Sequence, residues 1–261
     1  MSEAEAHRET TRREFAKQAA SFERQGSLFR NRDILDWIGE HVPVAEADVV
    51  LDVAGGTGGL GRYLAERASF VVVVDLTREM LEAGASAARE ESVTNVVFAE
   101  GDATGLPFAA AQFDLVVSRF AFHHIDDPGL AAREMARVCR PGGTVVVVDL
   151  TSEPGVAGER HTELERLRDP SHARALGREE LVTVLSQAGL HAEEAVVRCQ
   201  PLDAQRWLDQ GQPSERVRAD LLAALEGEAD GGEATGLHAA RRDGALTIEQ
   251  EYVIARGLAG A

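Results

Sequence analysis

The sequence lacks the features that mark small secreted domains and membrane proteins. Its 261 residues include only two cysteines, Cys139 and Cys199, too few for a disulfide framework or a four-thiolate metal site. The N-terminal segment MSEAEAHRETTRREFAKQ is charged and has no apolar core of the kind that a secretory signal peptide needs. No run approaches 18 uncharged apolar residues, so we expect no transmembrane helix. These absences predict a cytoplasmic protein in a reducing compartment.

Positive charge is scarce as well. The 27 Lys and Arg residues are outnumbered by 44 Asp and Glu residues, which gives a net charge of -17. Such a surface repels phosphate backbones and anionic lipids, so nucleic acid and membrane surfaces are not expected as partners. A hydrophobic fraction of 44% in a chain of this length suffices for a sizeable core. We therefore expect a soluble globular protein, and the oligomeric state stays unknown at this point.

Short valine-rich runs recur along the middle of the chain, with helical patterns between them. This alternation is typical of βαβ units. The unbroken valines of 71–74 and 145–148 suit strands that are buried on both faces, as in a parallel sheet. The prediction is an α/β fold with a doubly wound, mostly parallel sheet and helices on both faces. The expected strands are 48–53, 70–75, 95–100, 113–118 and 144–149.

After Leu150 the pattern is looser. Residues 151–177 are polar and rich in glycine and proline, which predicts a loop or short lid. A helix over 178–188, a strand over 191–199 and a helix over 203–226 are expected to follow, and 245–256 alternates like a last strand. The predicted parts of the chain are an N-terminal helical cap (1–45), an α/β core (46–200), a helical lid insertion (201–244) and the final strand of the core (245–261).

A glycine-rich turn follows the first predicted strand, in the segment LDVAGGTGGLGRYL. A turn of this kind lets the backbone approach a ligand closely. Gly56, Gly58 and Gly61 spell the dinucleotide fingerprint G-x-G-x-x-G. Asp75 ends the next strand, where an acid can hold ribose hydroxyls. Taken alone, these residues indicate an NAD(P)-dependent oxidoreductase as well as they indicate any other nucleotide-binding enzyme.

Asp52, just before the glycines, favours a different ligand. A carboxylate pointing into the glycine turn would oppose the dianionic pyrophosphate of a dinucleotide. S-Adenosylmethionine instead carries an ammonium, a sulfonium and a ribose, and no phosphate. With these residues the chain resembles the class I S-adenosylmethionine-dependent methyltransferases. Within them it is similar to the small-molecule group that includes the ubiquinone and menaquinone ring C-methyltransferases.

The resemblance covers roughly 45–200 and rests on the motifs LDVAGGTG, VVVVDLTREML, GDATGLPF, FDLVVSRFAFHHI and CRPGGTVVVVD, in that order. It implies a Rossmann-like fold with a helical and loop lid. One departure is Ala54, which stands where many members have a first glycine, and the quinone-type enzymes share this departure. The cofactor-binding residues that the resemblance implies are Phe22, Asp52, Ala54, Gly55, Gly56, Gly58, Asp75, Leu76, Met80, Asp102, Ala103, Ser118 and Arg119.

The resemblance also implies individual roles. Asp52 would lie toward the methionine end of the cofactor, and Asp75 would bind the ribose diol. Leu76 and Met80 would flank the adenine, and Asp102 would accept from its amino group. The remaining implied contacts are an aromatic cover over the cofactor from Phe22, the Ala103 N–H beside Asp102, and Arg119 on the methionine carboxylate or the lid.

Two adjacent histidines, His123 and His124, follow the fourth predicted strand. Methyl transfer needs positioning, exclusion of water and, for some acceptors, removal of a proton. Imidazole titrates near neutrality, so both histidines are candidate catalytic bases. By resemblance, His123 falls where quinone-type members carry an arginine near the substrate. Either histidine could instead only hold the loop or the lid by hydrogen bonds. No metal is expected, because adjacent side chains rarely converge on one ion.

The sequence therefore predicts a methyltransferase that moves the methyl of S-adenosylmethionine to an oxygen or carbon of a small metabolite, such as a natural product of secondary metabolism. S-Adenosylhomocysteine is the expected product. Two alternatives stay open. One is the NAD(P)-dependent oxidoreductase. The other is a family member that binds S-adenosylmethionine without methyl transfer and uses the sulfonium charge to assist a rearrangement.

Overall fold

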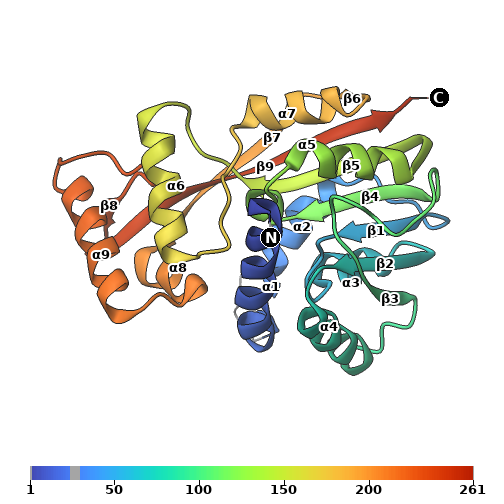
Figure 1. Ribbon diagram of the computed structural model, residues 1–261, viewed down its shortest axis with the longest axis horizontal. Helices are drawn as coiled ribbons and strands as arrows, with labels where there is room; N and C mark the ends of the chain where they lie inside the picture. The colour runs from blue at the N-terminus through green and yellow to red at the C-terminus, as the bar shows by residue number, and fades with distance from the viewer. Residues whose placement is uncertain (1, 24–29, 261) are drawn as a thin grey trace.

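Alternation along the central strands places successive valine side chains on opposite faces of one sheet. The computed structural model describes residues 2–23 and 30–260. Its central strands are parallel, in the order β3-β2-β1-β4-β5, and the last strand, β9, runs antiparallel beside β5 (Figure 1). The expected parallel strands are confirmed. They are β1 (Val49–Val53), β2 (Phe70–Asp75), β3 (Val96–Glu100), β4 (Phe113–Arg119) and β5 (Cys139–Leu150), and β9 is Ala245–Ala259.

Helices cover both faces of this sheet, each through its own hydrophobic cluster. On one face, Val50 and Val71 pack with α2, α3 and α4. On the other, Leu51 and Val145 pack with α5 and α7. The α/β, doubly wound architecture is therefore confirmed, since neighbouring residues of one strand, such as Val50 and Leu51, serve opposite layers. The helices are α2 (Arg32–His41), α3 (Gly59–Ala65), α4 (Arg78–Glu90), α5 (Pro128–Val138) and α7 (Arg178–Gln187).

The strand order reverses between β1 and β4, at the centre of the sheet. β1 pairs with β2 on one side and with β4 on the other, and all three run in the same direction. Their carboxyl ends therefore meet at one edge. Ligands of open α/β sheets bind outside that edge, at the point where the strand order reverses. The fold thus places the glycine turn after β1, Asp75 after β2 and the two histidines after β4 around one crevice.

The far half of β9 leaves the core and carries a second lobe (Figure 1). There β9 pairs with β7 over 247–254 and with β8 over 245–247. The lobe has its own apolar core, in which Trp207 is fully buried among leucines. We use the name second lobe for α6 (Val156–Arg168), α8 (Ala204–Gly211), α9 (Glu215–Ala229) and β8 (Ala240–Arg242) with the β9 residues that pair with β8; β7 (Val196–Asp203) and the short β6 (Leu190–Ala192) also pair with β9.

The prediction of a loop over 151–177 is wrong, because α6 occupies half of this segment. The buried positions of α6 include His161, Glu165 and Arg168. Glu165 accepts hydrogen bonds from Arg168 Nε at 2.8 Å and from Trp207 Nε1 at 2.9 Å. A helix that packs through an ionic network lacks the apolar stripe by which helices are found in a sequence. The pattern therefore missed it.

Two smaller differences concern elements of the second half of the chain. The helix expected over 203–226 is divided into α8 and α9, because Gln212 adopts a left-handed conformation (φ 52°) before Pro213, which cannot continue a helix. The strand expected over 191–199 is likewise divided into β6 and β7. Of the two cysteines, Cys139 is buried and Cys199 is exposed.

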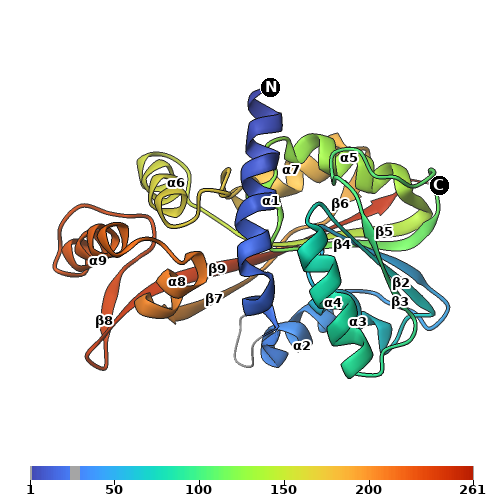
Figure 2. The same cartoon turned by 60° about the horizontal axis from the view of Figure 1, so that its bottom comes forward.

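The N-terminal helix α1 (Glu3–Phe22) lies between α4 and the second lobe (Figure 2). Its first turn is closed by a capping box, in which the Ser2 hydroxyl accepts from Glu5 N and the Glu5 carboxylate accepts from Ser2 N. Residues of α1 and residues at the carboxyl edge of the sheet line one cavity, where the candidate site lies.

Across residues 2–23 and 30–260, no helix is long and apolar enough to cross a bilayer.

Candidate active site

A tight turn joins β1 to α3 at the carboxyl edge of the sheet. Ala54 and Gly56 both have left-handed backbone conformations, with φ of 50° and 58°. Helix α4 packs directly on this turn, because a Cβ at Gly84 would lie 2.4 Å from the carbonyl oxygen of Thr57. Such an approach is open only to glycine. The turn is therefore held rigidly between the sheet and α4.

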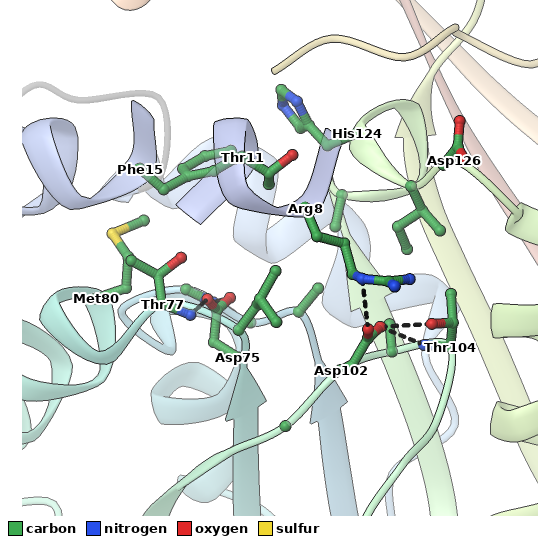
Figure 3. Close-up of a pocket in the computed structure, with 18 of the residues that line it drawn as sticks. Arg8, Thr11, Phe15, Asp75, Thr77, Met80, Asp102, Thr104, His124 and Asp126 are labelled. Carbon is green, nitrogen blue, oxygen red and sulfur yellow. Dashed lines mark hydrogen bonds and ion pairs between the residues drawn. The ribbon is translucent and has the colours of Figure 1, made fainter. Parts of the chain in front are cut away.

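A cavity of about 320 Å³ opens beside this turn and is covered by α1. Its volume lies at the lower end of the range for small-molecule sites. Figure 3 shows Arg8, Thr11 and Phe15 of α1 above Asp75, Thr77 and Met80. Of the expected site residues, those that line the cavity are Phe22, Ala54, Gly55, Gly56, Asp75, Leu76, Met80, Asp102, Ala103, Arg119 and His124.

Asp75 is fixed in the cavity wall by the backbone on both sides. Its Oδ2 accepts from Gly56 N and its Oδ1 accepts from Thr77 N, both at 2.8 Å. Burial raises the pKa of Asp75, and the N–H donors of Thr77 and Gly56 oppose that rise. Each carboxylate oxygen keeps a further lone pair, because an ionised carboxylate offers about four acceptor sites. The side chain is thus oriented in advance for a ligand with two adjacent donors.

Asp102 connects the opposite wall of the cavity with α1. Its Oδ1 accepts from Thr104 N at 2.8 Å and from Thr104 Oγ1 at 2.7 Å. Its Oδ2 lies 3.5 Å from Arg8 Nε, so the two residues form an ion pair across the cavity (Figure 3). Helix α1 is also attached at His7, whose Nε2 is 2.8 Å from the carbonyl oxygen of His124. These contacts hold α1 over the cavity.

Apolar groups close the end of the cavity next to α4. Phe22 packs with Met80 in a small cluster, and Phe15 lies against both. The rings of Phe15 and Phe22 are 6.0 Å apart in an edge arrangement. Phe15 also meets the ring of His124 edge-on at 4.8 Å. The cavity is therefore apolar at this end, and His124 is placed against its aromatic wall.

His123, one of the two candidate bases and the one that the resemblance places near the substrate, does not line the cavity. It is buried, with Nδ1 2.5 Å from Asp149 Oδ1, and its backbone N donates to Asp149 Oδ2 at 2.9 Å. Burial alone would lower the pKa of His123, but the Asp149 carboxylate outweighs burial and raises it above the ordinary value. His123 therefore forms a buried ion pair behind the cavity wall. The placement expected from the sequence was wrong for this residue.

Asp52 also lies behind the wall rather than in the cavity. Its Oδ2 accepts from Gly61 N at 2.9 Å, and a Cβ on Gly55 would meet its Cγ at 2.7 Å. Burial raises the pKa of Asp52 to about 7, against the opposing charge of Arg119. The Asp52 side chain thus links the turn to α3 by a hydrogen bond, and the positive charge of Arg119 partly offsets the effect of burial on its pKa. Gly58 and Ser118 are likewise absent from the described lining.

Of the two adjacent histidines, His124 is the one that lines the cavity. It belongs to a short 3-10 turn after β4, η2 (Phe122–His124). Its Nδ1 lies 3.1 Å from both the carbonyl oxygen and the Oγ of Ser171. Burial and the neighbouring His123 lower the pKa of His124 to about 4. The imidazole is therefore neutral at physiological pH, and one nitrogen is anchored outside the cavity.

Sequence reasoning missed most of the α1 contribution. The residues of α1 that line the cavity recur every three or four positions, which is one face of a helix. That spacing was visible, but the stripe mixes small, charged and aromatic residues. No described residue of the predicted lid segments 151–177 and 201–244 lines the cavity. The missed lining residues are Ala4, His7, Arg8, Thr11, Phe15, Thr57, Thr77, Gly101, Thr104, Phe120, Ala121, Ile125, Asp126, Asp127 and Leu130.

The described residues do not present a metal-binding constellation. Among them, no group of three or more His, Cys, Asp or Glu side chains is arranged to hold an ion. The cavity instead combines backbone donors, the four carboxyl groups of Asp75, Asp102, Asp126 and Asp127, and apolar surface. That donor set fits an uncharged sugar and base better than it fits a phosphate or a metal.

Comparison with known proteins identifies the family. The methyltransferase domain family matches residues 51–147. The uncharacterized methyltransferase YcgJ of Bacillus subtilis is 32% identical over 205 residues, 76% of this chain and 81% of that protein. The ubiquinone/menaquinone biosynthesis C-methyltransferase UbiE of Roseobacter denitrificans is 32% identical over 134 residues, 50% of this chain and 52% of that protein.

Solved structures agree with this assignment. The crystal structure of YcgJ superimposes with a TM-score of 0.81 at 25% identity and covers 88% of this chain and 100% of that one. The [4+2]-cyclase SpnF has a TM-score of 0.63 at 18% identity, with 88% and 82% of the two chains covered, and this likeness concerns the fold alone. The alternative of an NAD(P)-dependent oxidoreductase has no support among these relatives. The chain belongs to the methyltransferase domain family and is a class I S-adenosylmethionine-dependent methyltransferase.

Proposed function

We propose that the protein methylates an oxygen or carbon of a small-molecule metabolite, such as a natural product, and that His124 is its catalytic base. The observation that carries this proposal is the cavity of about 320 Å³ that α1 covers. Helix α1 is attached to both walls, by Arg8 to Asp102 and by His7 to the carbonyl oxygen of His124. A macromolecular acceptor would have to displace this helix, whereas a small molecule fits beneath it.

The residues of the cavity suit the cofactor. Asp75 would hold the ribose diol, since backbone donors already orient both of its oxygens. Leu76 and Met80 would flank the adenine, and Asp102 with the Ala103 N–H would bind its edge. The bound cofactor supplies a methyl group that its sulfonium has already activated. The chain therefore has to align the acceptor, exclude water and remove a proton.

His124 is suited to remove that proton. Its Nδ1 is engaged outside the cavity by Ser171, and among the described residues no hydrogen-bond partner is found for Nε2. With its pKa lowered to about 4, the imidazole is neutral and holds a free lone pair at physiological pH. A base this weak accepts a proton only as the acceptor becomes acidic. An oxygen becomes strongly acidic while it gains the methyl group, so we expect proton transfer to accompany bond formation in the transition state.

A screen with labelled cofactor tests the proposal. The protein is incubated with S-adenosylmethionine carrying a deuterated methyl and with fractionated small-molecule extracts, and label transfer is followed by mass spectrometry. We expect label in a small molecule and an equal amount of S-adenosylhomocysteine. Binding of the cofactor with unlabelled but rearranged molecules would contradict methyl transfer and support the alternative of a rearrangement assisted by the sulfonium.

A matched pair of histidine variants tests the role of His124. A positioned base contributes about 10²- to 10⁴-fold to turnover. Since an amide can hydrogen-bond but cannot take a proton, His124→Gln should lower turnover by that factor and leave affinity for S-adenosylhomocysteine nearly unchanged. The control is His191→Gln, at an exposed histidine of β6. Full activity in His124→Gln would remove the base from the mechanism.

A further inference from the structure

The segment between α6 and α7 packs against the turn that carries His124. Ser171 places both its carbonyl oxygen and its Oγ 3.1 Å from His124 Nδ1. The same hydroxyl donates to Asp169 Oδ1 at 2.5 Å, and Asp169 Oδ1 also accepts from Ser171 N at 2.9 Å. Both Ser171 and Asp169 are buried. A continuous chain of contacts therefore runs from Asp169 through Ser171 to His124.

Backbone hydrogen bonds fix this packing independently of the side chains. Ala173 N and Arg174 N both donate to the carbonyl oxygen of His123, at 2.8 and 3.1 Å. On the opposite side, His7 of α1 holds the carbonyl oxygen of His124. The main chain of the turn is thus held from two directions, so its backbone cannot move away from the segment that carries Ser171 without breaking these contacts.

The donor and acceptor capacities of the groups determine where the protons lie in the contacts from Asp169 to His124. A backbone carbonyl only accepts, so its contact with His124 Nδ1 requires a proton on that nitrogen. An ionised carboxylate also only accepts, so the Ser171 hydroxyl gives its proton to Asp169 and turns a lone pair toward His124. Both contacts therefore demand the same tautomer, in which Nδ1 is protonated and Nε2 carries the lone pair.

We propose that Ser171 and Asp169 are positioning residues for His124, which hold it in the Nδ1–H tautomer and stabilise its imidazolium through the Ser171 hydroxyl. The tautomer follows from the contacts alone, whereas the stabilisation of the imidazolium rests on the proposed function. When Nε2 takes the proton that the acceptor releases, the positive charge lies two hydrogen bonds from the Asp169 carboxylate. Asp169 stays ionised and takes no proton.

The charged and titratable groups around His124 act in opposite directions. Burial and His123, the adjacent residue of the same turn, lower the pKa of His124 to about 4, whereas Asp169 and, from β5, Asp149 raise it. His172 lies with its ring 6.2 Å from that of His124, and burial lowers the pKa of His172 well below its ordinary value. On the side of α1, His7 contacts the carbonyl oxygen of His124. Among the described groups, Asp169 is the carboxylate that reaches His124 Nδ1 through a hydrogen-bonded side chain.

Nitrogen NMR of the histidine side chains tests the tautomer without any acceptor. The full chain is labelled with 15N-histidine, saturated with S-adenosylhomocysteine and measured at pH 7, and the His124 signals are identified by their absence in His124→Gln. We expect the proton on Nδ1 and a free lone pair on Nε2. A proton on Nε2, or an even mixture of tautomers, would overturn the proposal, whatever the activity of the His124 variant.

Kinetics of Asp169→Asn test the charge. The amide keeps an oxygen that can accept from Ser171 N and Oγ, so the turn stays intact while the negative charge is lost. With the acceptor found by the labelled-methyl screen, kcat should fall roughly 10- to 100-fold, the range for a hydrogen bond to a charged group. The KM of the acceptor and the affinity for S-adenosylhomocysteine should stay unchanged. The acid limb of the kcat profile should move to lower pH, because the charge that favours the imidazolium is gone.

Two further variants complete the design. Asp203→Asn is the matched control, because Asp203, like Asp169, accepts two hydrogen bonds at Oδ1, here from Gln205 N and Arg206 N, but lies at the start of α8 away from the cavity. It should keep the wild-type kcat. Ser171→Ala retains the backbone carbonyl and removes the hydroxyl. We therefore expect this variant to keep the Nδ1–H tautomer of His124 and to have a lower kcat. A wild-type kcat in both Asp169→Asn and Ser171→Ala would overturn the positioning role even if His124→Gln is inactive.

Discussion

Replacement of Asp75 tests two roles of its carboxylate, which are to stabilise the glycine turn and to bind the ribose of the cofactor. The carboxylate accepts from Gly56 N and Thr77 N, each at 2.8 Å, and would also accept from the two ribose hydroxyls. A hydrogen bond to a charged group contributes about 1.5–3 kcal/mol. Loss of two such bonds to the ribose should weaken binding of S-adenosylhomocysteine by roughly 10²-fold or more in Asp75→Ala. Asp75→Asn keeps one accepting oxygen, so its loss should be smaller.

Calorimetry and thermal unfolding together distinguish these effects. Titration with S-adenosylhomocysteine reports the affinity of the folded protein, and the melting temperature reports the turn. The control is Glu100→Gln, which removes a negative charge from the residue that pairs with Asp75 in the neighbouring strand, outside the cavity lining. It should leave the affinity unchanged. If Asp75→Ala melted at a lower temperature but bound within about threefold of wild type, the carboxylate would serve the turn alone.

Four further predictions follow from the site. Gly84→Ala should destabilise the protein and weaken cofactor binding, because its Cβ would lie 2.4 Å from the Thr57 carbonyl oxygen; thermal unfolding with and without S-adenosylhomocysteine checks this. Arg8→Gln should change the unfolding free energy by at most about 1 kcal/mol, since the Arg8–Asp102 pair is partly exposed, but should speed dissociation of S-adenosylhomocysteine in stopped flow. Turnover should keep its plateau down to about pH 5, because the pKa of His124 is lowered to about 4 and the lone pair is lost only below it; a limb near pH 6.5 in the kcat profile would contradict this. Transfer should continue in EDTA, because the sulfonium needs no Lewis acid; activity that returns only with added metal would refute this.

The fold was largely predictable, because the strands of the core bury both faces. Runs such as 71–74 carry uninterrupted valines, and this is the sequence pattern of a strand that is covered on both faces of a parallel sheet. Helix α6 was not predictable by the same logic. Its packing face carries Glu165 and Arg168, and Glu165 accepts hydrogen bonds from both Arg168 and Trp207. Because these buried residues are charged, a search for apolar periodicity does not find the helix.

The part of the cavity wall that we assign to the cofactor could be predicted as lining, because it consists of backbone turns and strand ends. Gly56 and Asp75 follow directly from the order of strand, turn and helix. Which of the two histidines, His123 or His124, lines the cavity could not be predicted, because adjacent residues of a turn point in different directions. That choice depends on Asp149 and Ser171, which lie on distant segments and hold one histidine each. The role of α1 depends on a contact of the same kind, between Arg8 and Asp102.

The most direct test of the account is the single-turnover rate of methyl transfer in wild type and in His124→Gln. Each protein is saturated with deuterium-labelled S-adenosylmethionine and mixed with the acceptor, and the labelled product is measured by mass spectrometry. We expect labelled product from wild type and a rate about 10²- to 10⁴-fold lower in the variant, with His191→Gln at the wild-type rate. Equal rates in all three proteins would contradict the assignment of His124, and label absent from every small molecule would contradict methyl transfer in this cavity.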